Sequence, residues 1–358
     1  MSALPLVSIV TPSYNQAAFL EQTIDSVLSQ DYPNLEYLIA DGGSTDGSLE
    51  IIRRYAHRLA WWVSEKDSGQ AEAINKGLQR TRGEIVAWLN SDDLYLPGAI
   101  SQAVEALQSN PDLGLVYGEA ISIDQDGRPL GRFKFEDWGL TDLVCFRIIC
   151  QPAVFMRRSV LERAGYLDPK FHFMLDHQLW IRMAQLAPIA HQPADPSLVD
   201  RPVVGLWAAA RQHPGAKNVS QASGFGRETF QVLEWMETCP DLSDWIRQNR
   251  GRVLAGAYRL NARYLLDDGL AGPALVSYWQ ALRRKPAYAL KHVHRALYAF
   301  FSILRLNPLI DPVAARLQTR KRARLTAALR RATIAAAGFR MPAEPYRLAD
   351  WVGIKLDD

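Results

Sequence analysis

The first ninety residues alternate short apolar runs with amphipathic segments, and this alternation limits the possible folds more than any other feature of the chain. Residues 6–10 (Leu-Val-Ser-Ile-Val) have the pattern of a buried strand, and Leu20, Ile24 and Val27 follow at helical spacing. A second apolar run occupies residues 35–40. The order of strand, helix and strand predicts a parallel sheet in an α/β fold.

The alternation continues to residue 89 and predicts four strands of a doubly wound sheet. We expect a helix at 49–55, a short strand at 60–63, a helix at 71–78 and a strand at 84–89. Polar turns follow the last three strands, at residues 41–43 (Asp-Gly-Gly), 67–69 (Asp-Ser-Gly) and 90–93 (Asn-Ser-Asp-Asp). Ligands of open α/β sheets bind at the carboxyl ends of the strands, so we expect a ligand site at this edge.

The remainder of the chain divides into a mixed segment and a helical one. Within 111–217, strand-like runs at 114–117, 153–156 and 202–209 are mixed with a helical segment at 175–186, which predicts the second half of one domain. Beyond residue 217 the pattern is all helical, with expected segments at 224–238, 251–266, 271–284, 287–305 and 312–336. We therefore predict one α/β domain at 1–217 and a basic helical region at 218–358.

Asp92 and Asp93 place two adjacent carboxylates at the expected ligand edge. Two neighbouring anions repel each other unless a cation or a ligand hydroxyl compensates them. Oxygen ligands suit Mg²⁺ or Mn²⁺. The alternative is a solvated turn in which one of the two residues caps the next helix.

The net charge of +3 conceals a strong asymmetry along the chain. Residues 251–341 contain 17 Lys and Arg but only three acids, whereas the rest contains 24 bases and 35 acids. A mildly acidic body with a strongly basic tail fits an enzyme held near an anionic partner. The expected helix at 313–337 could lie on an anionic membrane, or serve packing or self-association. Nucleic acid is disfavoured, since no recognised binding module accompanies the charge.

No part of the sequence has the pattern of a membrane-spanning segment or a secretion signal. The best apolar candidate, residues 296–304, is bounded by Arg295 and Arg305, and is far shorter than the roughly 20 residues that a span needs. We therefore expect a cytoplasmic location, with a peripheral position on the inner face of the membrane as its variant.

Six motifs in order make residues 6–217 resemble glycosyltransferase family 2, whose members have the GT-A fold. They are VSIVTPSYNQAAFLEQTIDSVLSQDYPNLEYLIADGGSTDGS, EKDSGQAEAINKGL, GEIVAWLNSDD, QPAVFMRRSVLERAGYLDPKF, DHQLWIRMA and RQHPGAK. The resemblance implies a Rossmann-like mixed sheet flanked by helices, here followed by an all-helical C-terminal extension. This chain has Asn90 and Leu175 where many relatives have acidic residues.

The resemblance also implies donor-binding residues at the ends of the strands. Asp93 would hold the metal and Asp92 the ribose or sugar, while Asp41 would recognise the base. His213 would reach the metal or the diphosphate, and Arg211 and Lys217 would add positive charge. The remaining donor-binding residues implied by similarity are Thr11, Pro12, Ser13, Tyr14, Asn15, Asp67, Gly69, Gln70 and Asn75.

Asp176 is the candidate general base. Inverting transfer needs one carboxylate near the acceptor hydroxyl, and Asp176 lies in the first turn of an expected amphipathic helix. It matches the position that the family uses as its base. Capping of the helix is the alternative role for Asp176, and His172 and His177 are nearby alternatives for the base.

The implied activity is inverting transfer of a sugar from a nucleotide-sugar donor to a glycan or lipid-linked acceptor, assisted by Mn²⁺ or Mg²⁺. UDP is the expected nucleotide and surface-polysaccharide synthesis in the cell envelope the expected role, both from resemblance. The Gln-x-x-Arg-Trp signature of processive synthases is absent, so we expect one sugar per encounter. Family members often act on lipid-linked acceptors, which favours the membrane interpretation of the tail.

Two alternative functions come from other classes. A nucleotidyltransferase also uses acidic metal ligands on an α/β sheet, but it usually begins with a Gly-rich phosphate loop and a Lys, which residues 11–15 lack. A non-catalytic nucleotide-binding scaffold could keep the fold and recruit partners through its tail. The retained Asp92, Asp93 and Asp176 argue against a scaffold. The sequence leaves the oligomeric state open.

Overall fold

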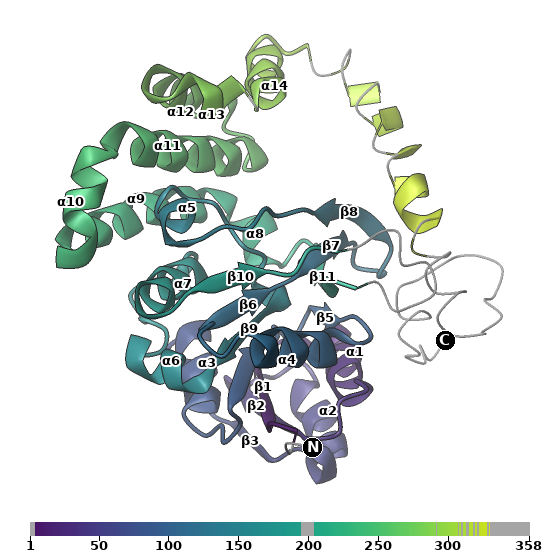
Figure 1. Cartoon of the computed structure of the whole chain (residues 1–358). Helices are drawn as coiled ribbons and strands as arrows, with labels where there is room; N and C mark the ends of the chain where they lie inside the picture. The colour runs from purple at the N-terminus through teal and green to yellow at the C-terminus, as the bar shows by residue number, and fades with distance from the viewer. Residues whose placement is uncertain are drawn as a thin grey trace.

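The four expected strands of the first ninety residues form the parallel half of a seven-stranded sheet (Figure 1). A computed structural model describes residues 4–194, 204–290 and 292–306, and further residues 308, 311, 312, 315–317, 319, 320, 322–327 and 329. The strands and their helices are β1 (Val7–Ser13), α1 (Ala17–Leu28), β2 (Leu35–Asp41), α2 (Ser48–Tyr55), η1 (Ala56–Arg58), β3 (Trp61–Ser64), α3 (Gln70–Leu78) and β4 (Ile85–Trp88). The predicted β-α-β order is therefore confirmed.

Three further strands complete this sheet and make it mixed. β9 (Val154–Arg157) runs antiparallel between β4 and β6 (Leu115–Tyr117), and β10 (Ile189–His191) lies beyond β6 at the edge. A second sheet has the order β5-β11-β7-β8, from β5 (Leu94–Tyr95), β11 (Leu206–Arg211), β7 (Glu119–Ile123) and β8 (Pro129–Phe133). The mixed sheet flanked by helices confirms the predicted fold class.

The remaining helices flank the sheets and build the C-terminal region at the top of Figure 1. They are α4 (Ala99–Ser109), α5 (Leu140–Val144), η2 (Gln151–Ala153), α6 (Arg158–Ala164), α7 (Leu175–Leu186), α8 (Lys217–Ser220), α9 (Ala222–Thr238), α10 (Pro240–Gln248), α11 (Arg250–Asp267), α12 (Ala271–Arg284), α13 (Pro286–Leu290) and α14 (Val293–Ile303). The expected helix at 287–305 is divided into α13 and α14, and α10 was not expected. Proline starts α10 and α13, because the first turn of a helix tolerates its missing N–H.

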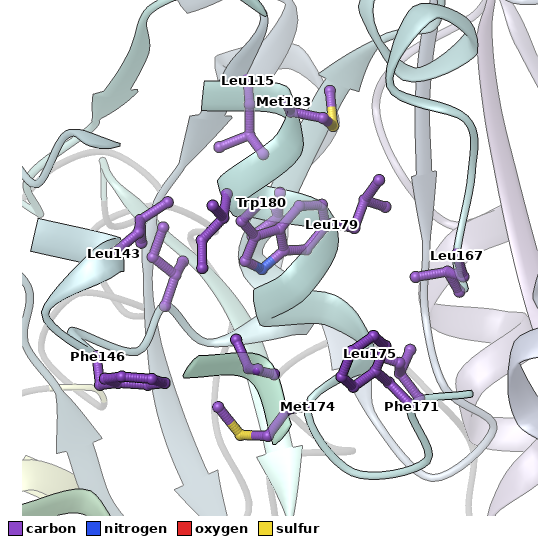
Figure 2. Packing of buried hydrophobic residues seen from close by; sticks show 14 of the residues in the cluster. Leu115, Leu143, Phe146, Leu167, Phe171, Met174, Leu175, Leu179, Trp180 and Met183 are labelled. Atoms are coloured by element: carbon purple, nitrogen blue, oxygen red, sulfur yellow. The ribbon is translucent and has the colours of Figure 1, made fainter. Parts of the chain in front are cut away.

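The hydrophobic core runs without interruption from the sheet into the helical region. Trp180 of α7 stacks on Trp88 of β4 with ring centroids 5.1 Å apart, and Figure 2 shows Leu143, Phe146 and Met174 grouped around the same helix. The same buried cluster includes residues of α9, α10 and α11 (Val232, Leu233, Met236, Leu242, Ile246, Val253, Ala257 and Leu260). The predicted boundary after residue 217 thus crosses one continuous core.

Helix α11 packs closely against the end of α5. A Cβ atom added at Gly256 would lie 2.1 Å from the carbonyl oxygen of Cys145, so only glycine permits this approach. Arg259 donates a hydrogen bond to the carbonyl oxygen of Phe146 at 2.7 Å. The helical region is therefore joined to the body by packing and by hydrogen bonds.

Among the described helices, none combines the length and hydropathy of a membrane span. Most of the basic helix expected at 313–337 lies outside the described residues. Of its described part, Leu325 and Leu329 pack against a small cluster formed by β5, β7 and β11.

Candidate active site

The carboxyl ends of the parallel strands bring the predicted polar turns together at one edge of the sheet. The register pairs Ser13 with Asp41, and Asp41 with Ser64, so the ends of β1, β2 and β3 are neighbours. Asp41 is buried, and its carboxylate accepts hydrogen bonds from the backbone N–H groups of Gly43 (3.1 Å) and Ser44 (2.9 Å) and from the Ser64 hydroxyl (2.7 Å). Asp41 thus shapes its own turn. Its predicted role in base recognition stays a prediction.

Asp67 faces this turn from the end of β3. A Cβ atom at Gly42 would lie 2.8 Å from Oδ2 of Asp67, so a larger residue at this position would have to displace the carboxylate. Burial raises the pKa of Asp67, and the negative charges of Glu72 and Asp41 act in the same direction. The structure therefore brings Asp41 and Asp67 together, as expected for residues of one ligand site.

The segment 11–15 splits into a buried and an exposed part. Thr11 is fully buried and its hydroxyl hydrogen-bonds to the Tyr37 hydroxyl at 2.9 Å; Pro12 is also buried. Tyr14 is 63% exposed, and Asn15 has a φ of 51° and accepts a hydrogen bond from the Thr45 backbone N–H. A ligand at this edge can meet the side chains of Tyr14 and Asn15, whereas that of Thr11 serves the core.

Ser13 carries a further signal of a polar ligand. Its hydroxyl is buried and has no hydrogen-bond partner among the described residues. Buried hydroxyl groups without partners are rare, because each forfeits its hydrogen bonds to water. The position at the carboxyl end of β1 is where the sequence predicts donor contacts.

A chain of hydrogen bonds links the start of α3 with the acidic turn after β4. Gln70 donates from Nε2 to Oδ1 of Asn90 (2.9 Å), and Asn90 donates from Nδ2 to Oδ2 of Asp93 (3.2 Å). The Nζ of Lys217 donates to Oε1 of Gln70 (2.9 Å) and to the carbonyl oxygen of His172 (3.2 Å). Burial lowers the pKa of Lys217. The network brings together two of the predicted donor-binding residues, Gln70 and Lys217, and the predicted metal ligand Asp93, although they are far apart in sequence.

The side chain of Asn75 makes its hydrogen bonds with the backbone of Leu167. It donates from Nδ2 to the carbonyl oxygen of Leu167 (2.8 Å) and accepts from the Leu167 backbone N–H (3.0 Å). Asn75 therefore fastens the segment before α7. Its predicted donor contact stays untested.

The two carboxylates of the acidic turn have different surroundings. Asp93 is buried and accepts hydrogen bonds from the Arg211 backbone N–H (2.9 Å) and from Asn90. Burial, followed by the charge of Asp92, raises the pKa of Asp93 to about 8. The side chain of Asp92 is 20% exposed, and its Oδ2 lies 3.1 Å from Nε2 of His213. Asp92 is thus the carboxylate that faces the outside of the turn, next to an imidazole.

The guanidinium of Arg211 makes its contacts inside the protein. Its guanidinium donates to backbone oxygens of Asp92 and Gln125 and to Oε1 of Gln22, each at 2.9 Å, and lies over the ring of Phe19. The phosphate contact expected from the sequence is therefore not available to this side chain without breaking these bonds. Arg211 instead holds the acidic turn against α1.

Asp176 lies in the first turn of α7 and is partly buried. Its Oδ1 accepts the backbone N–H of His177 at 2.7 Å. Burial raises the pKa of Asp176 to about 6, and the charge of Glu228 also raises it. Burial raises the pKa of the Cys150 thiol, and the charges of Asp93 and Asp176 add to this. Cys150 thus lies within electrostatic range of both acids.

The two histidine alternatives for the base are less suitable. His177 is buried, its Nε2 lies 3.0 Å from the carbonyl oxygen of Leu143, and burial lowers its pKa to about 4. His172 is exposed, and its backbone rather than its ring contacts the site network. Asp176 remains the candidate that combines position with a pKa suited to proton transfer near neutral pH.

Two residues of the site were missed by the sequence analysis. Gln151 accepts from Asn90 (3.1 Å) and donates to the Trp88 carbonyl oxygen (2.8 Å), which anchors the turn. Glu228 of α9 is buried and bonds to the backbone before α7. The available signal for Glu228 was its helical spacing from the apolar residues Val232 and Met236, which places an acid on the buried face of its helix.

Asp92 and His213 form a donor set that fits Mn²⁺ or Mg²⁺ only in part. Among the described residues, no three His, Cys, Asp or Glu side chains gather to hold a metal by themselves. A carboxylate oxygen and an imidazole nitrogen are suitable ligands for Mn²⁺, and such sites take further oxygens from phosphate and water. The residues therefore fit a metal that is shared with a phosphate-containing ligand.

Comparisons of the sequence with known proteins point to glycosyltransferases. The model of glycosyl transferase family 2 matches residues 8–165. A putative teichuronic acid biosynthesis glycosyltransferase, TuaG of Bacillus subtilis, is 38% identical over 140 residues, which cover 38% of this chain and 55% of TuaG. The O-antigen biosynthesis protein RfbC of Myxococcus xanthus is 30% identical over 190 residues, covering 52% of this chain and 15% of RfbC. The matches thus span at most about half of this chain and little more than half of TuaG.

Two solved structures share the fold over most of the chain. TarS 1–349 of S. aureus, in complex with UDP-GlcNAc, has a TM-score of 0.53 and 14% identity, and the match covers 81% of this chain and 92% of TarS 1–349. The mannosyltransferase PcManGT of Pyrobaculum calidifontis, in complex with GDP-Man and Mn²⁺, has a TM-score of 0.54 and 22% identity, covering 91% of this chain and 86% of PcManGT. At these identities the likeness establishes the GT-A fold.

Proposed function

Residues 8–165 belong to glycosyl transferase family 2, and on this premise we propose that the protein transfers a sugar from a nucleotide-sugar donor to a hydroxyl group of a glycan or lipid-linked acceptor. The observation that carries the proposal is the pairing of Asp92 with His213 at the strand edge that also holds Asp41, Asp67 and the Lys217 network. This edge offers polar groups for a nucleotide and a place for a metal beside its phosphates.

The transfer is an inverting single displacement in which Asp176 is the general base. Asp176 takes the proton of the acceptor hydroxyl while the oxygen of that hydroxyl forms a bond to the anomeric carbon of the donor. The bond to the nucleoside diphosphate breaks on the opposite side. The pKa of about 6 supports this role, because the carboxylate is available at neutral pH and still binds a proton well.

Asp92 and His213 would hold the metal ion, and Lys217 contributes positive charge at the same edge. When bound, a divalent cation would neutralise charge on the departing diphosphate. The sequence analysis assigned the metal to Asp93 and the ribose or sugar to Asp92. We revise that assignment because Asp93 is buried and hydrogen-bonded within the protein, whereas Asp92 faces His213.

UDP is the proposed nucleotide, with GDP as the alternative to be tested beside it. TarS was solved with UDP-GlcNAc and PcManGT with GDP-Man, so both nucleotides occur on this fold. The test is calorimetric titration with UDP, GDP, CMP and dTDP, each with and without Mn²⁺. We expect Mn²⁺-dependent binding of one nucleotide. Binding of none would reject the proposal and favour a non-catalytic scaffold, and pyrophosphate release from a nucleoside triphosphate would favour a nucleotidyltransferase.

The proposed setting is polysaccharide synthesis at an anionic membrane face. TuaG and RfbC are named for teichuronic acid and O-antigen biosynthesis. Among the described residues, fourteen large apolar side chains are exposed. Nine of them lie between Leu270 and Leu304, which is only a small part of the chain. Such clustering on a surface indicates an interaction site rather than chance exposure.

The apolar face of α14 is turned outward. Val293, Leu297, Phe300 and Leu304 follow at helical spacing and are each 46–50% exposed, and Trp279 of α12 is exposed beside them. A hollow of about 410 Å³ lies between α12, α13 and α14, lined by Trp279 and Val293 among others. Exposed Trp and Phe on a helical surface are typical of proteins that insert side chains into the membrane interface.

The charge of this surface favours lipid over protein partners. Residues 269–310 contain six Lys and Arg and no Asp or Glu. Such a surface attracts anionic lipids, at roughly 1 kcal/mol for each basic residue near the membrane. A second copy of this protein would present the same positive charge, so the two surfaces would repel each other. Residues 331–358 contain four bases and four acids, so they offer no complementary charge.

A further inference from the structure

Glu228 of α9 lies at the start of α7, next to the proposed base. Its Oε1 accepts the backbone N–H of His172 (2.7 Å), and its Oε2 accepts those of Phe173 (2.7 Å) and Met174 (2.5 Å). Glu228 is 4% exposed. One buried carboxylate thus binds three consecutive N–H groups that immediately precede α7, which begins at Leu175.

Lys217 holds the same segment from its other side. Its Nζ donates to the carbonyl oxygen of His172 at 3.2 Å and to Gln70 of the donor network at 2.9 Å. The backbone at 172–174 is therefore fixed between an acceptor from α9 and a donor from α8. Because Asp176 follows two residues later, this clamp determines where its carboxylate lies.

The carboxylate of Glu228 is not paired with a cation at contact distance among the described residues. Charged hydrogen bonds from backbone N–H groups compensate it instead, in the manner of an acid at a helix N-terminus. Its negative charge therefore acts on neighbouring groups: it adds to the effect of burial in raising the pKa of Asp176, and it opposes the effect of burial, which lowers the pKa of Lys217.

We propose that Glu228 is the positioning residue of the general base, and that it couples the C-terminal helices to the acceptor side of the active site. This inference rests on the proposed role of Asp176. Glu228 touches neither donor nor acceptor. It holds the first turn of α7 in place and supplies a fixed negative charge behind the base.

Three other groups interact with the Asp176 carboxylate by a hydrogen bond or through its charge. They are the His177 backbone N–H, which stabilises the carboxylate, and the side chains of Cys150 and Tyr264, whose pKa values are raised by its charge. Displacement of α7 could change these contacts as well, so Glu228→Gln alone does not separate charge from position. A shift in the Asp176 titration midpoint that occurs in Glu228→Gln but not in the charge-preserving Glu228→Asp would report the charge of Glu228.

The test compares Glu228→Gln with Asp176→Asn and with Glu234→Gln, an exposed acid on the same helix as matched control. The readouts are release of UDP from UDP-GlcNAc and of GDP from GDP-Man, nucleotide binding with Mn²⁺, and a ¹³C NMR titration of aspartate carboxyls. The Asp176 signal is identified by its loss in Asp176→Asn. The NMR readout does not depend on turnover.

We expect Glu228→Gln to lower kcat about 10–100-fold with little change in nucleotide binding, because the base is displaced while the donor site remains. The midpoint of the Asp176 titration should fall by about half a pH unit. Glu228→Asp keeps the negative charge on a shorter side chain. The titration midpoint of this variant should therefore lie close to the wild-type value, whereas its kcat should remain lowered. If Glu228→Gln does not fold, Glu228→Asp carries the test through its lowered kcat with unchanged nucleotide binding.

An unchanged kcat and titration midpoint in Glu228→Gln would overturn the inference. Parallel losses of kcat, nucleotide binding and thermal stability, with the midpoint unmoved, would also overturn it, because they would show a purely structural role. Full activity of Asp176→Asn would instead reject the proposed base itself, whatever Glu228→Gln does.

Discussion

The Nε2 atom of His213 lies 3.1 Å from Oδ2 of Asp92, although the two residues are 121 positions apart in sequence. Asp92 follows β4 of the large sheet, and His213 follows β11 of the small one. The ring of His213 packs on Phe19 of α1 with centroids 4.6 Å apart, which fixes its orientation. The pair therefore ties the two sheets together at the edge where the donor is expected to bind.

The first prediction concerns the metal. Asp92→Asn and His213→Ala should each weaken Mn²⁺-dependent nucleotide binding by about 10–100-fold, because each removes one of the two protein ligands that we assign. Asp93→Asn serves as the comparison, since its carboxylate is buried and hydrogen-bonded to the Arg211 backbone. Calorimetry with and without Mn²⁺ measures the effect. Loss of metal dependence in Asp93→Asn alone would return the metal to Asp93.

The second prediction concerns the base. Asp176→Asn should reduce transfer by about 10²–10⁴-fold, because the amide cannot accept the acceptor proton. Nucleotide binding should remain, since Asp176 lies on α7 and not on the strand ends. Steady-state rates and calorimetry on the same preparation separate the two effects. Turnover at the wild-type rate would remove Asp176 from the mechanism.

The third prediction is a pH dependence. The base works as a carboxylate, and burial raises the pKa of Asp176 to about 6, so kcat should be level above this pH and fall about tenfold per unit below it. Stability should respond in the opposite sense. The raised pKa means that folding favours the protonated acid, so its stabilising contribution is complete below the unfolded pKa near 4 and is lost as pH rises through about 6. Asp176→Asn should therefore raise Tm at pH 8 and leave it nearly unchanged at pH 4, as measured by scanning calorimetry.

The fourth prediction concerns the domain boundary. A chain that ends at residue 217 should fail to fold, because Val232, Leu233 and Val253 complete the core around α7. A chain that ends at 306 keeps α9 to α14 and should bind nucleotide like the full protein. Circular dichroism and nucleotide titration of both chains make the comparison. A folded 1–217 chain that binds nucleotide would show that the helices are a separate unit.

The fifth prediction concerns the membrane surface. Trp279→Ser and Phe300→Ser should reduce flotation with vesicles of phosphatidylglycerol and phosphatidylcholine, because both side chains are about half exposed on the apolar face of α12 and α14. Leu186→Ser is the control, as it removes an exposed apolar side chain from α7, outside this surface. High salt should weaken flotation, since basic residues contribute. Equal flotation of all three variants would exclude this surface as the membrane contact.

Several structural elements could be predicted closely because they depend on local periodicity. Helix α7 was expected at 175–186 and α12 at 271–284, which are the bounds in the structure. The turns after β2, β3 and β4 were expected at one edge, and the register of β1, β2 and β3 confirms this for the first two. Strands β5, β7, β8 and β10 were not expected. Of these, β5 and β10 have only two and three residues, which contain little pattern, whereas β6 was expected at 114–117.

The sequence by itself determined the β-α-β order of the first ninety residues, the edge at which a ligand is expected, and the resemblance to glycosyltransferase family 2, because these follow from spacing and from motifs that are contiguous in the chain. The tertiary structure decided which acid of the turn meets His213, that Arg211 is used internally, and that Glu228 reaches the start of α7. These contacts join residues that lie 54 to 189 positions apart. At such separations, the contacts between side chains depend on how the strands and helices pack. Local periodicity does not determine that packing.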